Sequence, residues 1–374
     1  MAFVHPDALP GQDTLEESRT ALAPYCRTIE YFPLWVKSSK VALAGALLAG
    51  TGSRRPFGAI AHRSRAFERR VAHHLSSRAF DIVHADTIAL SQFVDANGSV
   101  ATALTHHNIE SQLMARRAAI ESRWYARAYL KREAAKLMAY ESRESPRFGV
   151  NIVMSPQDGE TLRHLAPGAR IAVVPNGVDT EYFAADDSEL ETPALIYTGG
   201  MNMFANRDAV LSFLKETWPQ IVREAPATRF VAVGQDPPRE LLDLAAQDRR
   251  IEVTGYVSDI RPYVRRSAVY VVPLRVGGGT RLKVLDAMAM GKALVSTSIG
   301  CEGIEVTPGE HLLVADSPGA FAASTVALLA EAPRRQALGA AARRLVTERY
   351  AWGVIADRLF DAYEVARDVR RTVR

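Results

Sequence analysis

Residues 271–297 read VVPLRVGGGTRLKVLDAMAMGKALVST, an apolar run followed by a glycine turn, a helical pattern and a second apolar run. This order is typical of two neighbouring strands of a parallel sheet and the helix between them. The expected helix carries Arg281 and Lys283 in its first turn, where the helix dipole is already positive. Each such cation costs ~0.3–1 kcal/mol unless a negative group compensates it. The segment therefore predicts an α/β fold and an anion site at the start of this helix.

The same alternation of a β-branched run, a turn and a helical pattern recurs along the chain. Continuous apolar strands separated by helices indicate a parallel sheet that is covered on both faces. Ala209, Val210, Phe213 and Leu214 have the spacing that packs one of these helices on the sheet. The expected strands lie in residues 80–86, 100–108, 171–177, 194–200, 229–234, 251–255, 268–273 and 293–297.

The length of 374 residues, 48% of them hydrophobic, suits two domains with full cores. Asn176-Gly177 resembles a hairpin turn, but no alternating strand follows it. A polar stretch over residues 184–193 follows instead, as expected for a crossing between domains. The sequence predicts one domain over residues 1–177 and a second over residues 178–350.

Composition excludes several classes of protein. The longest apolar candidate, residues 41–50, is too short for a membrane span, and the N-terminal residues lack the pattern of a signal peptide. Cys26 and Cys301 are the two cysteines and have no metal-type spacing around them. A reduced, cytoplasmic compartment is the simplest interpretation.

The net charge is a mild +4, and part of the arginine content gathers in residues 122–144. A solvated helix with paired glutamates and basic residues is one interpretation of this segment. Attraction to an anionic membrane surface is the other, because Trp124, Tyr125, Leu130 and Leu137 stand among the charges. Nucleic-acid binding is not expected, since no recognition motif accompanies the charge.

Glycine turns follow two of the expected strands, at the edge where open parallel sheets bind ligands. Gly199-Gly200 would let the backbone come close to a phosphate. The dinucleotide fingerprint G-x-G-x-x-G is absent, which argues against a dehydrogenase. Among the residues of the second turn, Gly277, Gly278, Gly279 and Thr280, the threonine suits a helix N-cap.

The helix that follows this turn gives a reason for the two cations at its start. Leu282, Leu285 and Ala289 would form its buried stripe. Arg281 and Lys283 would then point toward the free N–H groups, with Arg275 upstream, so that a diphosphate fits this position.

Asp286 lies one turn further along the same helix. It either pairs with Lys283 at i, i+3 or accepts hydrogen bonds from the ribose hydroxyls beside a diphosphate.

Two adjacent histidines, His106 and His107, end a strand of the first domain. Histidines at strand ends are often structural, yet one of this pair is a candidate for chemistry at the sheet edge. Nothing else has the spacing of a metal site, and no G-x-S-x-G elbow supports a hydrolase triad.

Several segments together resemble the group 1, family-four glycosyltransferases. They are VVPNGVDTEYF (173–183) and residues 273–297, supported by FDIVHAD (80–86), HNIES (107–111), TGYV (254–257) and RYAW (349–352). The resemblance covers nearly the whole chain. It implies a GT-B fold of two facing Rossmann-like domains, with a nucleotide-sugar donor held mainly by the second. It also implies that a C-terminal helix, residues 351–374 here, returns to the first domain.

The resemblance also implies a retaining, metal-independent hexosyltransferase that uses no cofactor besides its donor. Lys283 and Arg281 would hold the diphosphate, Asp286 the ribose, and the Gly199-Gly200 turn the phosphate or sugar. Tyr256 and Val257 would offer backbone groups to the base. His107 would face the transferred sugar.

The sequence departs from the family's pattern in three places, two at the donor site and one at the N-terminus. The family's two glutamates, separated by seven residues, are replaced by Gly278 and Asp286, so the backbone of Gly277, Gly278 and Gly279 would contact the sugar. Gly200 and Asn206 stand near the places of a usual arginine and lysine, whose charge Arg281 and Lys283 would supply. Residues 1–7, MAFVHPD, resemble the family's second strand, so that one strand, one glycine-rich loop and one helix would be absent.

The expected function is transfer of a sugar from a UDP- or GDP-linked donor to a glycan or lipid-linked acceptor of envelope or exopolysaccharide synthesis. The protein is expected in the cytoplasm, with peripheral contact to an anionic membrane. Two alternatives stay open. One is a non-catalytic nucleotide-sugar-binding or scaffold protein, and the other is an enzyme of this fold that epimerises or hydrolyses a nucleotide sugar.

Overall fold

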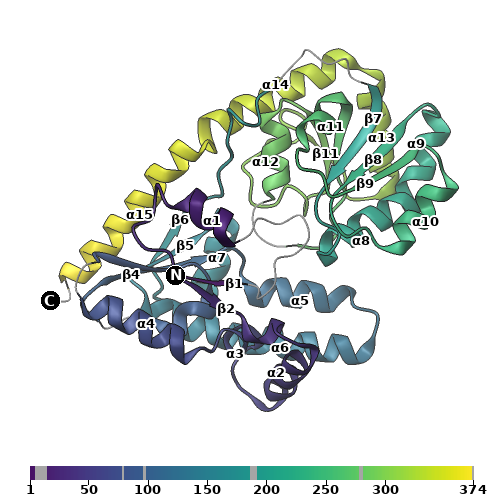
Figure 1. Cartoon of the computed structure of the whole chain (residues 1–374). Helices are drawn as coiled ribbons and strands as arrows, with labels where there is room; N and C mark the ends of the chain where they lie inside the picture. Colours follow the sequence, from purple (N-terminus) through teal and green to yellow (C-terminus); the bar gives the residue numbers. More distant parts are fainter. Residues whose placement is uncertain (5–14, 78–79, 96–97, 186–191, 278–280, 373–374) are drawn as a thin grey trace. The chain divides into compact units, whose positions relative to one another are not determined.

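A computed structural model describes residues 1–4, 15–77, 80–95, 98–185, 192–277 and 281–372 (Figure 1). The chain divides into two compact units. Unit 1 contains residues 1–153, 159–172 and 361–374, and unit 2 contains residues 154–158 and 173–360.

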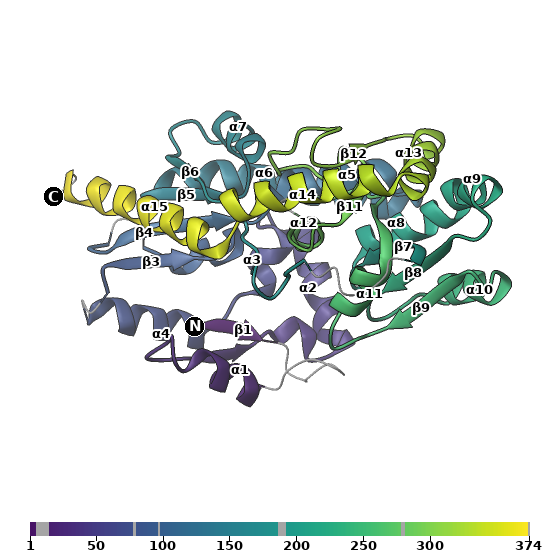
Figure 2. The ribbon, with the colours of Figure 1, turned by 90° about the horizontal axis from the view of Figure 1, so that it is seen from above.

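Unit 2 is built on a six-stranded sheet in the order β12-β11-β10-β7-β8-β9. Its strand pairs are parallel, and in Figure 2 the labelled strands run from β12 at the top to β9 at the bottom. The strands are β7 (Thr192–Thr198), β8 (Arg229–Val233), β9 (Ile251–Gly255), β10 (Ser267–Val272), β11 (Ala293–Ser296) and β12 (Leu313–Val314).

Helices cover both faces of this sheet, which is why its strands are continuous apolar runs. Phe213 and Phe230 pack with their ring centroids 5.2 Å apart, and the predicted stripe of Ala209, Val210, Phe213 and Leu214 is buried as expected. The helices are α8 (Phe204–Ser212), the π-helical turn η4 (Phe213–Thr217), α9 (Trp218–Glu224), α10 (Arg239–Gln247), α11 (Arg261–Arg266), α12 (Leu282–Ala289), α13 (Pro318–Ala330) and α14 (Ala332–Arg349).

Unit 1 contains a four-stranded sheet in the order β3-β4-β5-β6. Its strands are β3 (Ile82–Ala85), β4 (Ala101–His106), β5 (Val150–Val153) and β6 (Ile171–Val173). The eight strands expected from sequence are thus confirmed, whereas β5 and, in unit 2, β12 were not expected. Asn151 interrupts the apolar run of β5, and its buried side-chain amide donates to the carbonyl of Ser145 at 2.9 Å.

The N-terminal part of unit 1 forms a separate pair of parallel strands, β1 (Ala2–Val4) and β2 (Tyr31–Pro33). Helix α1 (Leu15–Leu22) lies between them in sequence, so the described segment begins as a strand-helix-strand unit. The expectation that a strand, a loop and a helix are absent from this end stays a prediction.

The remaining helices of unit 1 include the long antiparallel pair α5 and α6 (Figure 1). Helix α6 buries Glu133, Lys136, Glu141 and Glu144, so it is not the fully solvated helix of the first interpretation. Its first residue, Trp124, is 79% exposed. The helices are η1 (Trp35–Lys37), α2 (Lys40–Gly52), α3 (Phe57–Ala61), α4 (Arg65–Ser76), η2 (Ile88–Phe93), α5 (Glu110–Ile120), α6 (Trp124–Glu144) and η3 (Ser145–Arg147).

Two helices contain residues of both units, α7 (Pro156–Leu165) and α15 (Trp352–Thr372). The unit of α15 changes at Asp361. None of the described helices is long and apolar enough to cross a membrane.

Candidate functional site

The strand order of unit 2 reverses between β7 and β10. The chain runs from β7 outward through β8 and β9, and then returns to place β10 on the other side of β7. Open parallel sheets bind ligands at the carboxyl ends of the two strands at such a switch point. Here these ends lead into the Gly199-Gly200 turn and into the segment that precedes α12.

The ammonium of Lys283 reaches from α12 to this switch point. Its Nζ donates to the hydroxyl of Tyr197 at 2.9 Å and to Oδ1 of Asn206 at 2.8 Å. It also lies 4.1 Å from the centroid of the Tyr197 ring. Asn206 in turn donates from Nδ2 to the carbonyl of Gly200 at 2.9 Å. Lys283, Asn206 and the glycine turn, all predicted from sequence, therefore form one cluster.

The surroundings of Lys283 disfavour its charged form. Burial and, to a smaller extent, the positive charge of Arg281 lower the pKa of its ammonium to about 7, while Asp286 acts in the opposite direction. A cation that is desolvated in this way gains more from an incoming anion than an exposed lysine does. The cluster is therefore suited to bind a diphosphate.

Close packing explains the glycine after β7. Gly199 has a φ of +148°, and a Cβ atom built on it would lie 2.4 Å from Nζ of Lys283. Gly234, after β8, has a φ of +159°, and its Cβ would lie 2.0 Å from the carbonyl oxygen of Gly199. Both positions require glycine, because a side chain at Gly199 would collide with the Lys283 ammonium and one at Gly234 would collide with the Gly199 backbone.

Arg281 directly precedes α12. The helix begins at Leu282 with Arg281 as an extended N-cap residue, so the prediction that Arg281 belongs to the first turn is wrong. Its Nη2 lies 3.4 Å from the carbonyl oxygen of Ile299, and a Cβ on Gly277 would lie 2.3 Å from the same nitrogen. Because Arg281 is the N-cap residue, the prediction that Thr280 caps α12 is wrong, and Gly278, Gly279 and Thr280 themselves lie outside the described residues.

The predicted buried stripe of α12 is corrected at one position. Leu282 is 49% exposed, because it lies in the first turn, ahead of the part of α12 that packs on β11 and α14. Leu285 and Ala289 are buried as predicted, together with Val284, Ala287 and Met288.

Asp286 lies on α12 one turn beyond Lys283. Among the described residues, Lys283 binds Tyr197 and Asn206 rather than forming a salt bridge with Asp286, although the two charges shift each other's pKa. Burial raises the pKa of the Asp286 carboxyl to about 7, and the nearby Lys283 acts against this rise. Hydrogen-bond donors such as ribose hydroxyls would stabilise the ionised form.

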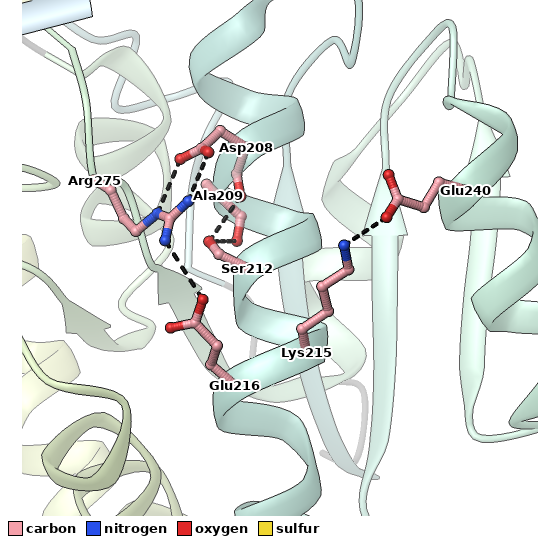
Figure 3. A network of polar contacts seen from close by, with 7 residues as sticks. All are labelled: Asp208, Ala209, Ser212, Lys215, Glu216, Glu240 and Arg275. Carbon is pink, nitrogen blue, oxygen red and sulfur yellow. Dashed lines mark hydrogen bonds and ion pairs between the residues drawn. The ribbon is translucent and has the colours of Figure 1, made fainter. Parts of the chain in front are cut away.

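Arg275 is engaged by carboxylates. Its guanidinium donates to both carboxylate oxygens of Asp208, at 3.0 and 2.7 Å, and reaches Glu216 at 3.5 Å (Figure 3). These contacts lie along α8 and η4, and none of them reaches the Lys283 cluster. The structure therefore does not bring Arg275 together with Lys283, and its role as a donor-binding residue stays a prediction.

Tyr256 and Val257 follow β9, two strands away from β7 in the sheet. Tyr256 is 57% exposed, and Val257 packs partly against the core of unit 2. Their backbone role toward a base stays a prediction.

His107 and Asp86 form a second polar centre, in unit 1. Because β3 and β4 are parallel neighbours, the residues that follow them meet. Nε2 of His107 lies 3.0 Å from Oδ1 of Asp86, and this hydrogen bond raises the pKa of the half-exposed imidazole. His106 is buried instead, and burial lowers its pKa to about 4. His107 is therefore the member of the pair that can carry charge near neutral pH.

Tyr197 and Asp86 are the site residues that the sequence analysis missed. Tyr197 stands inside an apolar strand and looked like core, and no spacing marks its hydroxyl as a partner of a lysine. Asp86 directly follows a predicted strand, so the rule that ligands bind at strand ends could have found it. Among the described residues, no three His, Cys, Asp or Glu side chains gather as metal ligands.

Comparisons with known proteins identify the family of both halves of the chain. Residues 192–331 match the family model of glycosyl transferases group 1, and residues 38–182 match that of glycosyltransferase family 4. The predicted resemblance is confirmed.

The curated relatives are partial matches. An uncharacterized 44.6 kDa protein in the cps region of Klebsiella pneumoniae is 27% identical over 37% of this chain and 38% of the relative. A GDP-mannose-dependent α-(1-6)-phosphatidylinositol monomannoside mannosyltransferase of Mycobacterium tuberculosis is 27% identical over 52% of this chain and 56% of the relative. The chain thus spans about half or less of the length of these relatives.

Solved structures confirm the fold. Sucrose-phosphate synthase of Thermosynechococcus elongatus has a TM-score of 0.63 at 18% identity, covering 80% of this chain and 76% of that one. HepE of Anabaena, solved with UDP and glucose, has a TM-score of 0.63 at 11% identity, covering 92% and 88%. The predicted α/β fold of the GT-B type is confirmed.

Proposed function

We propose that this chain, which belongs to the group 1, family-4 glycosyltransferases, transfers a sugar from a nucleoside-diphosphate sugar to a glycan or lipid-linked acceptor. The observation that carries the proposal is the desolvated Lys283 at the switch point of unit 2. Its ammonium lies under the Gly199-Gly200 turn and beside Asp286, so diphosphate and ribose have adjacent partners.

The leaving diphosphate would be stabilised by Lys283 and Arg281. Fixed cations in a site with little water act strongly on a developing negative charge and need no reorganisation during the reaction. The reaction would retain the anomeric configuration and proceed without a metal ion. His107, with its pKa raised by Asp86, would face the transferred sugar as a hydrogen-bond donor.

The donor would carry UDP or GDP. HepE of Anabaena was solved with UDP, and the mycobacterial relative is GDP-mannose-dependent, so both bases have support among similar proteins. The backbone of Gly277, Gly278 and Gly279 would contact the sugar, with Thr280 beside it. Tyr256, Val257 and Arg275 would complete the donor site.

Synthesis of envelope or exopolysaccharide on the cytoplasmic face of a membrane would suit this chemistry. The exposed Trp124 and Tyr125 at the start of α6 stand next to Arg123 and Arg127. Exposed aromatic rings among basic residues suit peripheral contact with an anionic membrane.

Calorimetry with UDP and GDP tests the donor site. The double variant Lys283→Ala, Arg281→Ala should lose at least tenfold in affinity for the nucleotide that the wild type binds. The matched control is Lys215→Ala, because Lys215 is an exposed cation of η4 that pairs with Glu240 (Figure 3). Unchanged affinity in the double variant would contradict the diphosphate assignment.

The rival function is a non-catalytic nucleotide-sugar-binding protein, favoured by Gly278 in place of the family's first glutamate. Both candidates bind nucleotide, so turnover separates them. Slow hydrolysis of a nucleotide sugar, or transfer to any acceptor, that is lost in Lys283→Ala supports the enzyme. Tight binding with neither activity supports the rival.

A further inference from the structure

A cavity of about 420 Å³ lies within unit 1, between α2, α3, η2, α5 and α6. Its volume falls in the range of ~300–1,000 Å³ that is usual for small-ligand sites. Apolar side chains form much of its wall, among them Leu43 and Leu47 from α2 and Leu130 and Leu137 from α6. The ionisable side chains of His62, Arg117 and Glu133 also line it. The proposed donor chemistry uses none of these residues.

The polar side of the cavity adjoins the His107–Asp86 pair. Thr87, the residue after Asp86, and Glu110 both line the cavity. Glu110 and His107 influence each other's charge, and burial raises the pKa of the Glu110 carboxyl. One cavity thus joins an apolar wall to the polar centre where the proposed function places the transferred sugar, which is the group that the acceptor must reach.

Buried polar contacts fix the distance between the walls of the cavity. The carboxylate of Glu133 accepts from the backbone N–H of Phe57 at 2.9 Å and pairs with Lys136, and the ammonium of Lys136 donates to the carbonyl of Gly50 at 3.0 Å. These contacts tie the end of α2 and the start of α3 to α6. Because a buried charge cannot give up its partner cheaply, α2 cannot simply collapse into the cavity.

Helix α2 is apolar on both of its faces. Leu43 and Leu47 line the cavity, while Val41 and Leu48 are 81% and 72% exposed on the outside. A helix that is apolar all round is normally buried or in contact with lipid. A hydrocarbon occupant therefore suits this helix better than a polar sugar does.

We propose that this cavity holds the hydrocarbon chain of an amphiphilic acceptor whose polar end lies at His107. The occupant is a linear alkyl or acyl chain or a branched prenyl chain, which share the same chemistry. Its identity as the acceptor rests on the proposed function, whereas the binding of the chain does not.

The test is calorimetry on the full chain without nucleotide, with hexyl, octyl and decyl glucoside below their micelle concentrations. Affinity should rise about fourfold per added methylene, as expected for burial of hydrocarbon. Equal affinity for the three glucosides would overturn the proposal. Decanol and geraniol, which have equal carbon numbers, then distinguish a linear from a branched chain, and tighter binding of either one supports the cavity.

Two tryptophan variants of α2 locate the binding. Leu47→Trp places a ring in the cavity and should lose at least tenfold in affinity for decyl glucoside. Leu48→Trp is the matched control on the outside of the same helix and should stay within twofold of the wild type. Leu43→Trp is a second cavity variant in case Leu47→Trp does not fold. Equal losses in the cavity and control variants, or no loss in the cavity variants, would overturn the proposal.

Nucleotide binding by the same samples separates the two proposals. Chain-length-dependent binding without any affinity for UDP or GDP supports the cavity and contradicts the proposed donor site. Nucleotide binding without any affinity for alkyl glucosides contradicts the cavity alone.

Discussion

Nζ of Lys283 lies 2.8 Å from Oδ1 of Asn206, although 77 residues separate them in the chain. The contact joins the start of α12 to the start of α8 across the two strands at which the sheet order reverses. Asn206 compensates part of the lysine's desolvation without neutralising its charge, because an amide oxygen carries only a partial charge. The ammonium therefore keeps most of its capacity to attract an anion.

Nucleotide binding should take up a proton at pH 8. Burial holds the pKa of Lys283 at about 7, so the amine is mostly neutral at pH 8, and a bound diphosphate would raise this pKa. Calorimetry in buffers of different ionisation enthalpy should give an uptake approaching one proton, with affinity falling as the pH rises above 7. The uptake should vanish in Lys283→Met, and an uptake that persists in this variant would assign the proton to another group.

Asp286→Asn should stabilise the free protein while weakening nucleotide binding. Because the pKa of Asp286 is raised to about 7 by burial, its folded state favours the protonated carboxyl, and stability is lost as the pH rises from about 4 through 7. The variant should therefore gain in Tm over the wild type at pH 8 and lose this gain toward pH 4, as measured by thermal unfolding without nucleotide.

The control for this variant is Asp357→Asn, at an exposed position of α15. It should leave both the Tm difference and the nucleotide affinity unchanged. A Tm gain of Asp286→Asn that is equal at pH 4 and pH 8 would contradict the proposed ionisation.

Gly199→Ala should abolish nucleotide binding by displacing Lys283. The added methyl would lie 2.4 Å from Nζ, and the φ of +148° is unfavourable for any side chain. A titration calorimeter and a melting curve together measure the lost binding and the lost stability. Gly353→Ala, where nothing lies within 4 Å of an added Cβ, is the matched control. Full affinity in Gly199→Ala would mean that the turn does not shape the site.

Asp86→Asn should lower the pKa of His107. The hydrogen bond and the charge of Asp86 both raise this pKa, so removing the charge favours the neutral imidazole. NMR titration of the histidine ring protons measures the change. His106 serves as an internal reference, because burial holds its pKa at about 4 and it should not titrate between pH 6 and 8. An unchanged titration of His107 would show that Asp86 does not control its charge.

Regular elements were predictable from sequence where one physical requirement dominates. Buried parallel strands must be apolar throughout, and this property marked eight of them. Strand β5 was not predicted because Asn151 lies within it and donates to the Ser145 carbonyl, and β12 was not predicted because it has only two residues. The stripe of α12 was misjudged only at Leu282, since periodicity does not tell where the sheet beneath a helix ends.

The sequence by itself determined the α/β class, the family resemblance and the positions of the glycine turns, since apolar runs and turn residues act locally. Tertiary structure alone decided that Lys283 faces Tyr197 and Asn206, that Asp286 is left without an ion pair among the described residues, and that His107 rather than His106 meets Asp86. The physical reason is that these contacts depend on the order of strands in a sheet. Strand order brings together residues that no local pattern relates.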